Sequence, residues 1–142
     1  MRQEGETTVI RITPDAGSVK SSQYRDVPLH QQLIDQGFLD FVNAAKAGPL
    51  FHDLPANPYE GARRNANRLS AWLAGKKAIP EGIQPNHAWR HRFTSIGIAV
   101  GIENRIRKAI QGHSARDISE HYGDVPIPVM KAAIDRLPTY KI

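Results

Sequence analysis

The stretch Thr7-Thr-Val-Ile-Arg-Ile-Thr13 is followed directly by Pro14-Asp-Ala-Gly17. The valine and the two isoleucines of the first segment are β-branched and favour a strand, whereas Pro-Asp-Ala-Gly is typical of a turn. A second extended stretch runs from Tyr24 to Leu29. Together they predict an antiparallel β-hairpin over residues 7–29, with Lys20 at its tip.

Apolar residues recur at helical spacing through most of the remaining chain. The expected helices lie at residues 30–45, 60–75, 86–100, 103–111 and 126–137, with a further short helix from Ser114 to about Tyr122. Asn86 is a candidate N-cap for the third of them, which should bury Phe93, Ile96 and Val100. The sequence predicts a mainly α fold with a small antiparallel β-hairpin, in a single domain over residues 1–142 with its helical part at 30–138.

The composition of the chain limits the classes of protein to consider. At 142 residues with 40% hydrophobic content, it can bury one modest core. It contains no cysteine, which excludes disulfides and thiolate metal sites, and no apolar run long enough to span a bilayer. It also has no signal-peptide pattern at its beginning. We therefore expect a cytoplasmic protein without a membrane partner.

The positive charge of the chain is concentrated between Glu60 and Arg92. This stretch contains seven Lys or Arg and two acids, so it accounts for the whole net charge of +5. The candidate DNA-binding residues within it are Arg63, Arg64, Arg68, Lys76, Lys77 and Arg92. A phosphate backbone would select such a cluster, although a solvated helix face has the same composition.

His87 and Arg90 are spaced one helical turn apart. Their side chains would project from the same face and could hold one anion between an imidazole and a guanidinium. If Asn86 caps the helix, both lie in its first turn, where the helix dipole favours a phosphate. A simple surface pair would have the same spacing.

His113 follows Gly112 at a predicted corner between helices, and Tyr122 lies nine residues later. On one continuous helix the two side chains would point to opposite sides, so they can converge only if the chain turns between them. A histidine at a corner can also cap a carbonyl, and a tyrosine can be half-buried without any chemical role. His87, His91 and His113 could be read as a zinc cluster, but no second ligand pair supports a metal site.

These segments, in this order, resemble the tyrosine recombinase (phage integrase) family. Val19–His30 is similar to the family's β-hairpin and the Val-Pro-Leu segment that follows it, and Pro85–Phe93 resembles its Pro-His-x-Leu-Arg-His-x-Phe box. Gln111-Gly-His-Ser114 and Tyr122 then fall at family-like separations. The resemblance runs from about Thr7 to Leu137 and implies the fold of the recombinase catalytic domain.

The resemblance also implies a role for each residue in site-specific recombination of duplex DNA. Tyr122 would attack the scissile phosphate and form a 3′-phosphotyrosyl bond, while Arg90 and His113 donate to the non-bridging oxygens. His87 would assist proton transfer from the tyrosine, and Lys20 would protonate the leaving 5′-oxygen. A phenol with a pKa of about 10 needs such a base or cationic field to react at neutral pH. Neither metal nor ATP is required, because the phosphotyrosine conserves the bond energy.

One departure from the family pattern concerns a further arginine that the family places upstream of the hairpin. Arg2 and Arg11 are in the wrong place to serve, since Arg11 lies inside the predicted strand. The resemblance therefore predicts a C-terminal, N-terminally truncated part of a recombinase, inactive or nearly so alone. Phosphoryl-transfer residues act non-additively, so one missing cation costs several orders of magnitude in rate.

Two other functions share these features: a non-catalytic DNA-binding remnant of an integrase, and a nicking enzyme similar to type IB topoisomerases. We also expect the fragment to form homo-oligomers. The missing helices would leave apolar surface uncovered, and the segment after the tyrosine often docks on a neighbouring protomer in the family.

Overall fold

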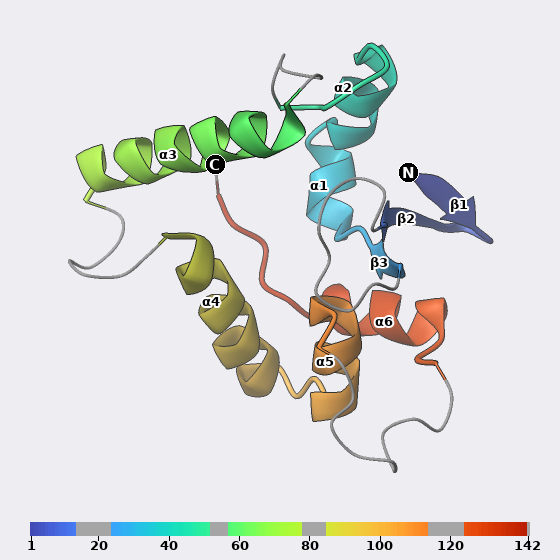
Figure 1. The fold of residues 1–142 in the computed structure, drawn as a ribbon. Coiled ribbons are helices and arrows are strands. Elements are labelled where there is room, and N and C mark those ends of the chain that lie inside the picture. Colours follow the sequence, from blue (N-terminus) through green and yellow to red (C-terminus); the bar gives the residue numbers. More distant parts are fainter. Residues whose placement is uncertain (14–23, 52–56, 78–84, 114–123, 142) are drawn as a thin grey trace. The chain divides into compact units, whose positions relative to one another are not determined.

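The computed structural model describes residues 1–13, 24–51, 57–77, 85–113 and 124–141 (Figure 1). The strands are β1 (Arg2–Glu4), β2 (Thr7–Ile12) and β3 (Arg25–Pro28). The helices are α1 (Gln31–Asp35), α2 (Phe38–Ala44), α3 (Pro58–Gly75), α4 (Pro85–Ala99), α5 (Asn104–Gln111) and α6 (Ile127–Ile134). This arrangement confirms a mainly helical chain with a small antiparallel sheet. None of the helices described is both long and apolar enough to cross a membrane.

The chain divides into two compact units, which we describe separately. The first comprises Met1–Phe38 and Thr94–Ile142, and the second comprises Leu39–Phe93. The sheet, α1, α5 and α6 belong to the first unit, and α3 belongs to the second. The single domain over residues 1–142 stays a prediction, because two compact units can be parts of one domain.

The predicted β-hairpin is present, and it is extended by a strand that we did not predict. β2 pairs antiparallel with β3, with Val9 opposite Pro28 and Ile12 opposite Arg25. β1 pairs with the other edge of β2 through a two-residue turn at Gly5, whose φ of 59° suits a tight hairpin. The three residues of β1 are all exposed, so they lack the apolar alternation by which a strand is recognised in a sequence.

The core of the first unit lies between the sheet and the C-terminal helices. Helix α6 packs against β2 and β3, and α5 packs against α6 and β3 (Figure 1). The buried apolar residues of this unit are Val9, Leu29, Ile102, Ile110, Met130, Ala133 and Ile134. The apolar spacing predicted for α5 and α6 therefore identifies the faces that these helices bury.

The helix predicted over residues 30–45 is wrong in one respect, since it is broken into α1 and α2. Gly37 adopts a left-handed φ of 79°, and its N–H donates to the carbonyl of Ile34 at 3.0 Å, which ends α1. Helical spacing of apolar residues continues across the break, so the pattern alone does not reveal it. The imidazole of His30 caps α1 by accepting from the N–H of Gln32 at 3.0 Å.

Two further helix starts differ from the predictions. α3 begins at Pro58 rather than at residue 60, because the side chain of Asn57 accepts from the N–H of Glu60 at 3.0 Å and caps the helix. α4 begins at Pro85, which places Asn86 inside the helix and overturns its assignment as N-cap. Phe93 and Ile96 of α4, and Val100 just after its end, were expected to be buried and are half-buried.

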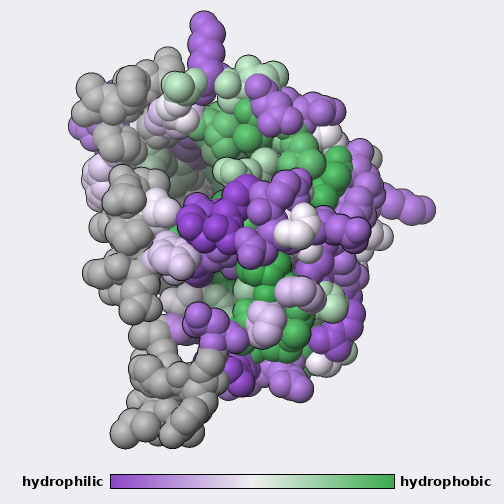
Figure 2. Space-filling view, turned by 90° about the vertical axis from the view of Figure 1, so that its right-hand side faces the viewer, coloured by the Kyte–Doolittle hydropathy of each residue, from purple (hydrophilic) through white to green (hydrophobic). Residues whose placement is uncertain are grey.

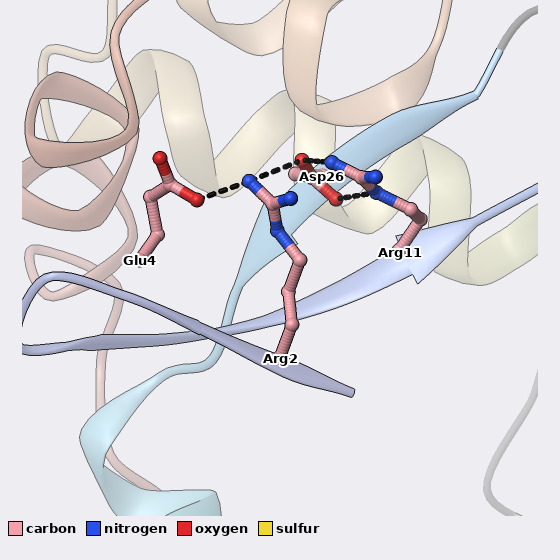
Figure 3. A network of polar contacts seen from close by, with 4 residues as sticks. All are labelled: Arg2, Glu4, Arg11 and Asp26. Atoms are coloured by element: carbon pink, nitrogen blue, oxygen red, sulfur yellow. Dashed lines mark hydrogen bonds and ion pairs between the residues drawn. The ribbon is translucent and has the colours of Figure 1, made fainter.

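Polar side chains on the sheet form a network of ion pairs around Asp26 (Figure 3). Arg11 donates through Nε and Nη2 to the two carboxylate oxygens of Asp26, at 2.9 and 2.7 Å. Arg2 approaches the same carboxylate at 3.6 Å and also pairs with Glu4. The Arg11 guanidinium lies 4.4 Å from the centre of the Tyr24 ring. Its hydrogen bonds to Asp26 hold the pKa of that carboxyl below its usual range. The network ties all three strands together.

This network predicts a pH dependence of stability. The lowered pKa of Asp26 means that its carboxylate contributes stability above the unfolded-state pKa of about 3.9, and that this contribution is lost as the pH falls through the folded-state pKa. Asp26→Asn should therefore lower the free energy of unfolding near pH 7, by about 1 kcal/mol or less because Arg11 is solvent-accessible and the pair is screened.

Urea unfolding of both proteins between about pH 7 and pH 2 measures this difference across both pKa values. The difference should shrink towards the acid end and at high salt. A difference of equal size at both ends of the range would show that the carboxylate charge contributes nothing.

Candidate functional site

Helix α4 carries the predicted His-x-x-Arg pair in the second unit. His87 and Arg90 are one helical turn apart in it, and Arg90 is exposed. The side chain of His87 lies outside the described residues. Because α4 begins at Pro85, His87 lies in its first turn, where backbone N–H groups have no partner within the helix. The helical placement of the pair is confirmed, and its joint action on one anion stays a prediction.

The residues predicted to bind DNA are all exposed in the structure. Arg63, Arg64 and Arg68 lie on α3, Lys76 and Lys77 follow its end, and Arg92 lies on α4. Glu60 pairs with Arg63 at 2.9 Å and with Arg64 at 3.1 Å, and these two arginines lower the pKa of Glu60. Part of the positive charge on α3 is thus offset locally.

The Gly-His corner forms at the end of α5 in the first unit. Gly112 has a left-handed φ of 68° and is the C-cap of the helix, and the next residue, His113, donates its N–H to the carbonyl of Lys108 at 3.0 Å. These bonds satisfy the last turn of α5 and turn the chain away from the helix axis. His113 emerges exposed from the corner. The chain thus turns at Gly112, whereas the turn expected between His113 and Tyr122 and the short helix expected from Ser114 to Tyr122 lie outside the described residues.

Arg25 lies against this corner. It is the half-buried first residue of β3, and its guanidinium occupies the space where a side chain on Gly112 would begin. A Cβ on Gly112 would lie only 2.6 Å from Cζ and 2.8 Å from Nε of Arg25. Two features favour glycine at position 112: its left-handed backbone, and the adjacent guanidinium, which a side chain there would have to displace.

The contact between Arg25 and Gly112 brings together two segments that the sequence analysis treated as separate candidate parts of one site. Arg25 begins the strand that follows Lys20 in the sequence, and Gly112 precedes His113. Lys20 and Tyr122 themselves lie outside the described residues. His113 belongs to the first unit and Arg90 to the second, so convergence of the five proposed catalytic residues stays a prediction.

Two basic features of the site were missed by the sequence analysis. Arg25 was part of a quoted motif but received no role, and its contact with Gly112 joins residues far apart in the sequence without any local signal. Helix α5 contains Arg105, Arg107 and Lys108 but no acidic residue. A separate count of the Lys, Arg, Asp and Glu in each predicted helix would have revealed this second basic helix, which lies outside the stretch from Glu60 to Arg92.

An apolar pocket of about 680 Å³ lies in the second unit. Its lining comes from residues 49–51 and from positions one turn apart on α3, namely Ala62, Asn65, Ala66 and Leu69. Large apolar side chains are exposed elsewhere in this unit, including Trp72 and Trp89. On the side of the molecule seen in Figure 2, hydrophobic residues reach the surface between hydrophilic ones. Among the described residues, no cluster of three or more His, Cys, Asp or Glu could hold a metal ion.

No family model matches the sequence, and neither a curated protein nor a solved structure matches it. The resemblance to tyrosine recombinases therefore rests on the motifs and their spacing.

Two of the left-handed glycines of the first unit, Gly101 and Gly112, provide a test of the Arg25 contact. Gly101→Ala and Gly112→Ala both place a Cβ on a left-handed backbone, at a cost of about 1–2 kcal/mol. At Gly101 the new atom would meet only Nη1 of Arg136, at 3.9 Å. At Gly112 it would displace the Arg25 guanidinium, so we expect a loss larger by about 1 kcal/mol or more.

Urea unfolding of the single variants and of Gly112→Ala combined with Arg25→Ala measures the coupling between the two sites. The excess loss at Gly112 should disappear in the Arg25→Ala background. Equal losses at the two glycines would contradict the close contact.

Proposed function

We propose that this chain is part of the catalytic domain of a tyrosine recombinase, which cuts and rejoins duplex DNA at a specific site through a 3′-phosphotyrosyl intermediate. The observation that carries the proposal is the ordered set of Lys20, His87-x-x-Arg90, Gly112-His113 and Tyr122. Support comes from the left-handed corner that presents His113 and from the packing of β3, the strand after the Lys20 hairpin, against it.

The proposed reaction exchanges one phosphodiester bond for another. The Tyr122 oxygen forms a bond to phosphorus while the bond from phosphorus to the 5′-oxygen breaks, and the phenol proton passes towards His87. Lys20 gives a proton to the departing 5′-oxygen. Negative charge that builds on the non-bridging oxygens is stabilised by Arg90 and His113, which donate hydrogen bonds without transferring atoms. The reverse steps, with a different 5′-hydroxyl, rejoin the strands.

The DNA partner of this proposal is the duplex that flanks the scissile phosphate. Exposed cations on α3 and α4 would contact its backbone and position the protein without reading sequence. A DNA-binding remnant would keep these contacts and lack the strand transfer, whereas a topoisomerase-like enzyme would keep the nucleophile and relax supercoiled DNA without recombining it. These two functions are therefore outcomes of the same test.

Trapping of the covalent intermediate tests the proposal. The protein is mixed with a nicked suicide substrate carrying its attachment site, so that the 5′-hydroxyl fragment diffuses away after cleavage. We expect a protein–DNA band on a denaturing gel that Tyr122→Phe abolishes, because the phenylalanine has no nucleophilic oxygen. Tyr140→Phe is the matched control, and it should leave the band unchanged.

The outcomes separate the alternatives. A band that survives Tyr122→Phe moves the nucleophile to another residue and contradicts the assignment. DNA binding without any covalent band contradicts strand transfer by this chain and favours the remnant.

We also propose that the protein forms homo-oligomers through apolar surface of the second unit. Leu69 lines the apolar pocket and is 40% exposed. Leu69→Gln should shift the chain towards a monomer in light scattering at high concentration, because the apolar contact is lost. Ile98→Gln, at an exposed residue of the first unit, is the control. A wild-type chain that is already monomeric at high concentration would contradict the proposal.

A further inference from the structure

The guanidinium of Arg25 is held in a fixed place at the corner that presents His113. Its backbone is part of β3 and pairs with Ile12, and its side chain lies against the α-carbon of Gly112. Since Arg25 is half-buried, the sheet and the end of α5 restrict its rotamers. An arginine restricted in this way can bind a ligand at a lower cost in conformational entropy than one on an open surface.

The surroundings of this corner are positively charged. Lys108 lies in the last turn of α5, and its carbonyl accepts the N–H of His113. Arg105 and Arg107 lie on the same helix, which contains no acidic residue. Arg25 adds a further cation beside the last turn. Lys108 and Arg25 therefore place two cationic side chains near His113, and cationic side chains attract anions.

We infer that Arg25 binds a phosphodiester of duplex DNA together with His113, which makes Arg25 a phosphate-binding residue of the proposed strand-transfer site. The inference takes its ligand from the proposed function. A guanidinium presents paired N–H donors that match two oxygens of one phosphate, and an imidazole on the adjacent residue can donate to the same group.

Arg25 moves no proton and forms no covalent bond in this scheme. Tyr122 bonds to phosphorus, the bond to the 5′-oxygen breaks, and Arg25 stabilises the charge on the non-bridging oxygens. Because its position is set before DNA binds, the stabilisation requires little reorganisation during the reaction.

A purely structural role is the alternative. Cations are favoured at the C-terminal ends of helices, so Arg25 could act only on the last carbonyls of α5. Arg136 shows such a role at the left-handed corner of Gly101, where its Nη1 donates to the carbonyl of Gly101 at 3.2 Å. Arg136 is therefore a matched control: an arginine beside a left-handed glycine, but away from His113.

The experiment measures the affinity of the full chain for a duplex over a range of salt concentrations. Each phosphate contact contributes about 0.9 to the slope of log K against log salt. Arg25→Gln should lower this slope by about 0.9 and weaken binding about tenfold at low salt, because one charged contact is lost. Arg25→Lys should keep the slope, and Arg136→Gln should behave as wild type. Thermal unfolding of each variant establishes that it is folded.

A titration of the ¹⁵N-labelled wild-type chain, followed by ¹H–¹⁵N NMR, gives a second measurement that needs no variant. On addition of the duplex, the Arg25 Nε–H and the backbone amides of Gly112 and His113 should shift with one common dissociation constant. The inference is overturned if these signals stay in place while the duplex binds. It is also overturned if Arg25→Gln lowers only the melting temperature, or if the duplex does not bind at all.

The covalent-adduct assay separates this inference from the proposed function. If the slope and the NMR shifts identify Arg25 but no adduct forms at Tyr122, the phosphate site stands and strand transfer fails. If the adduct forms equally well with Arg25→Gln and Arg136→Gln, strand transfer stands and the role of Arg25 fails.

Discussion

The packing of α5 and α6 against a three-stranded sheet is the constraint on which the first unit depends. A hairpin of six and four residues is marginal in water on its own, and β1 adds little because it is exposed. Burial of one face, through Val9 in the sheet and Ile134 in α6, provides the hydrophobic stabilisation that the strands lack. The position of Arg25 follows from this packing, because β3 cannot move without opening the core.

Left-handed glycines lie at the ends of several of the described helices. Gly37 separates α1 from α2, Gly101 leads from α4 towards α5, and Gly112 ends α5. At two of these corners an arginine from a distant part of the chain lies beside the glycine: Arg136 at Gly101 and Arg25 at Gly112. At these corners the direction of the chain is thus accompanied by a contact from a side chain that is distant in the sequence.

Helices α3 and α5 both carry clusters of positive charge, and a count along the sequence reveals only the first of these. The continuous basic stretch contains α3, where Glu60 offsets part of the charge of two arginines. Helix α5 is shorter and carries three cations without an acid, next to the corner of His113. Glu103 is the N-cap of α5, so the acid of this segment lies at the helix end opposite to the corner of His113.

The sequence by itself determined the fold class, the β2–β3 hairpin, the ends of α5 at Glu103 and Gly112, and the faces that α5 and α6 bury, because these depend on local propensity and periodicity. It also determined which residue types are available for phosphoryl transfer. Only the tertiary structure decided that the helix expected at residues 30–45 breaks at Gly37, that Asn86 lies within α4, and that Arg25 meets Gly112. The helix boundaries shift because capping depends on single side chains. The contact between Arg25 and Gly112 joins residues that are distant in the sequence. It is created by the packing of β3 against α5, so neither local sequence indicates it.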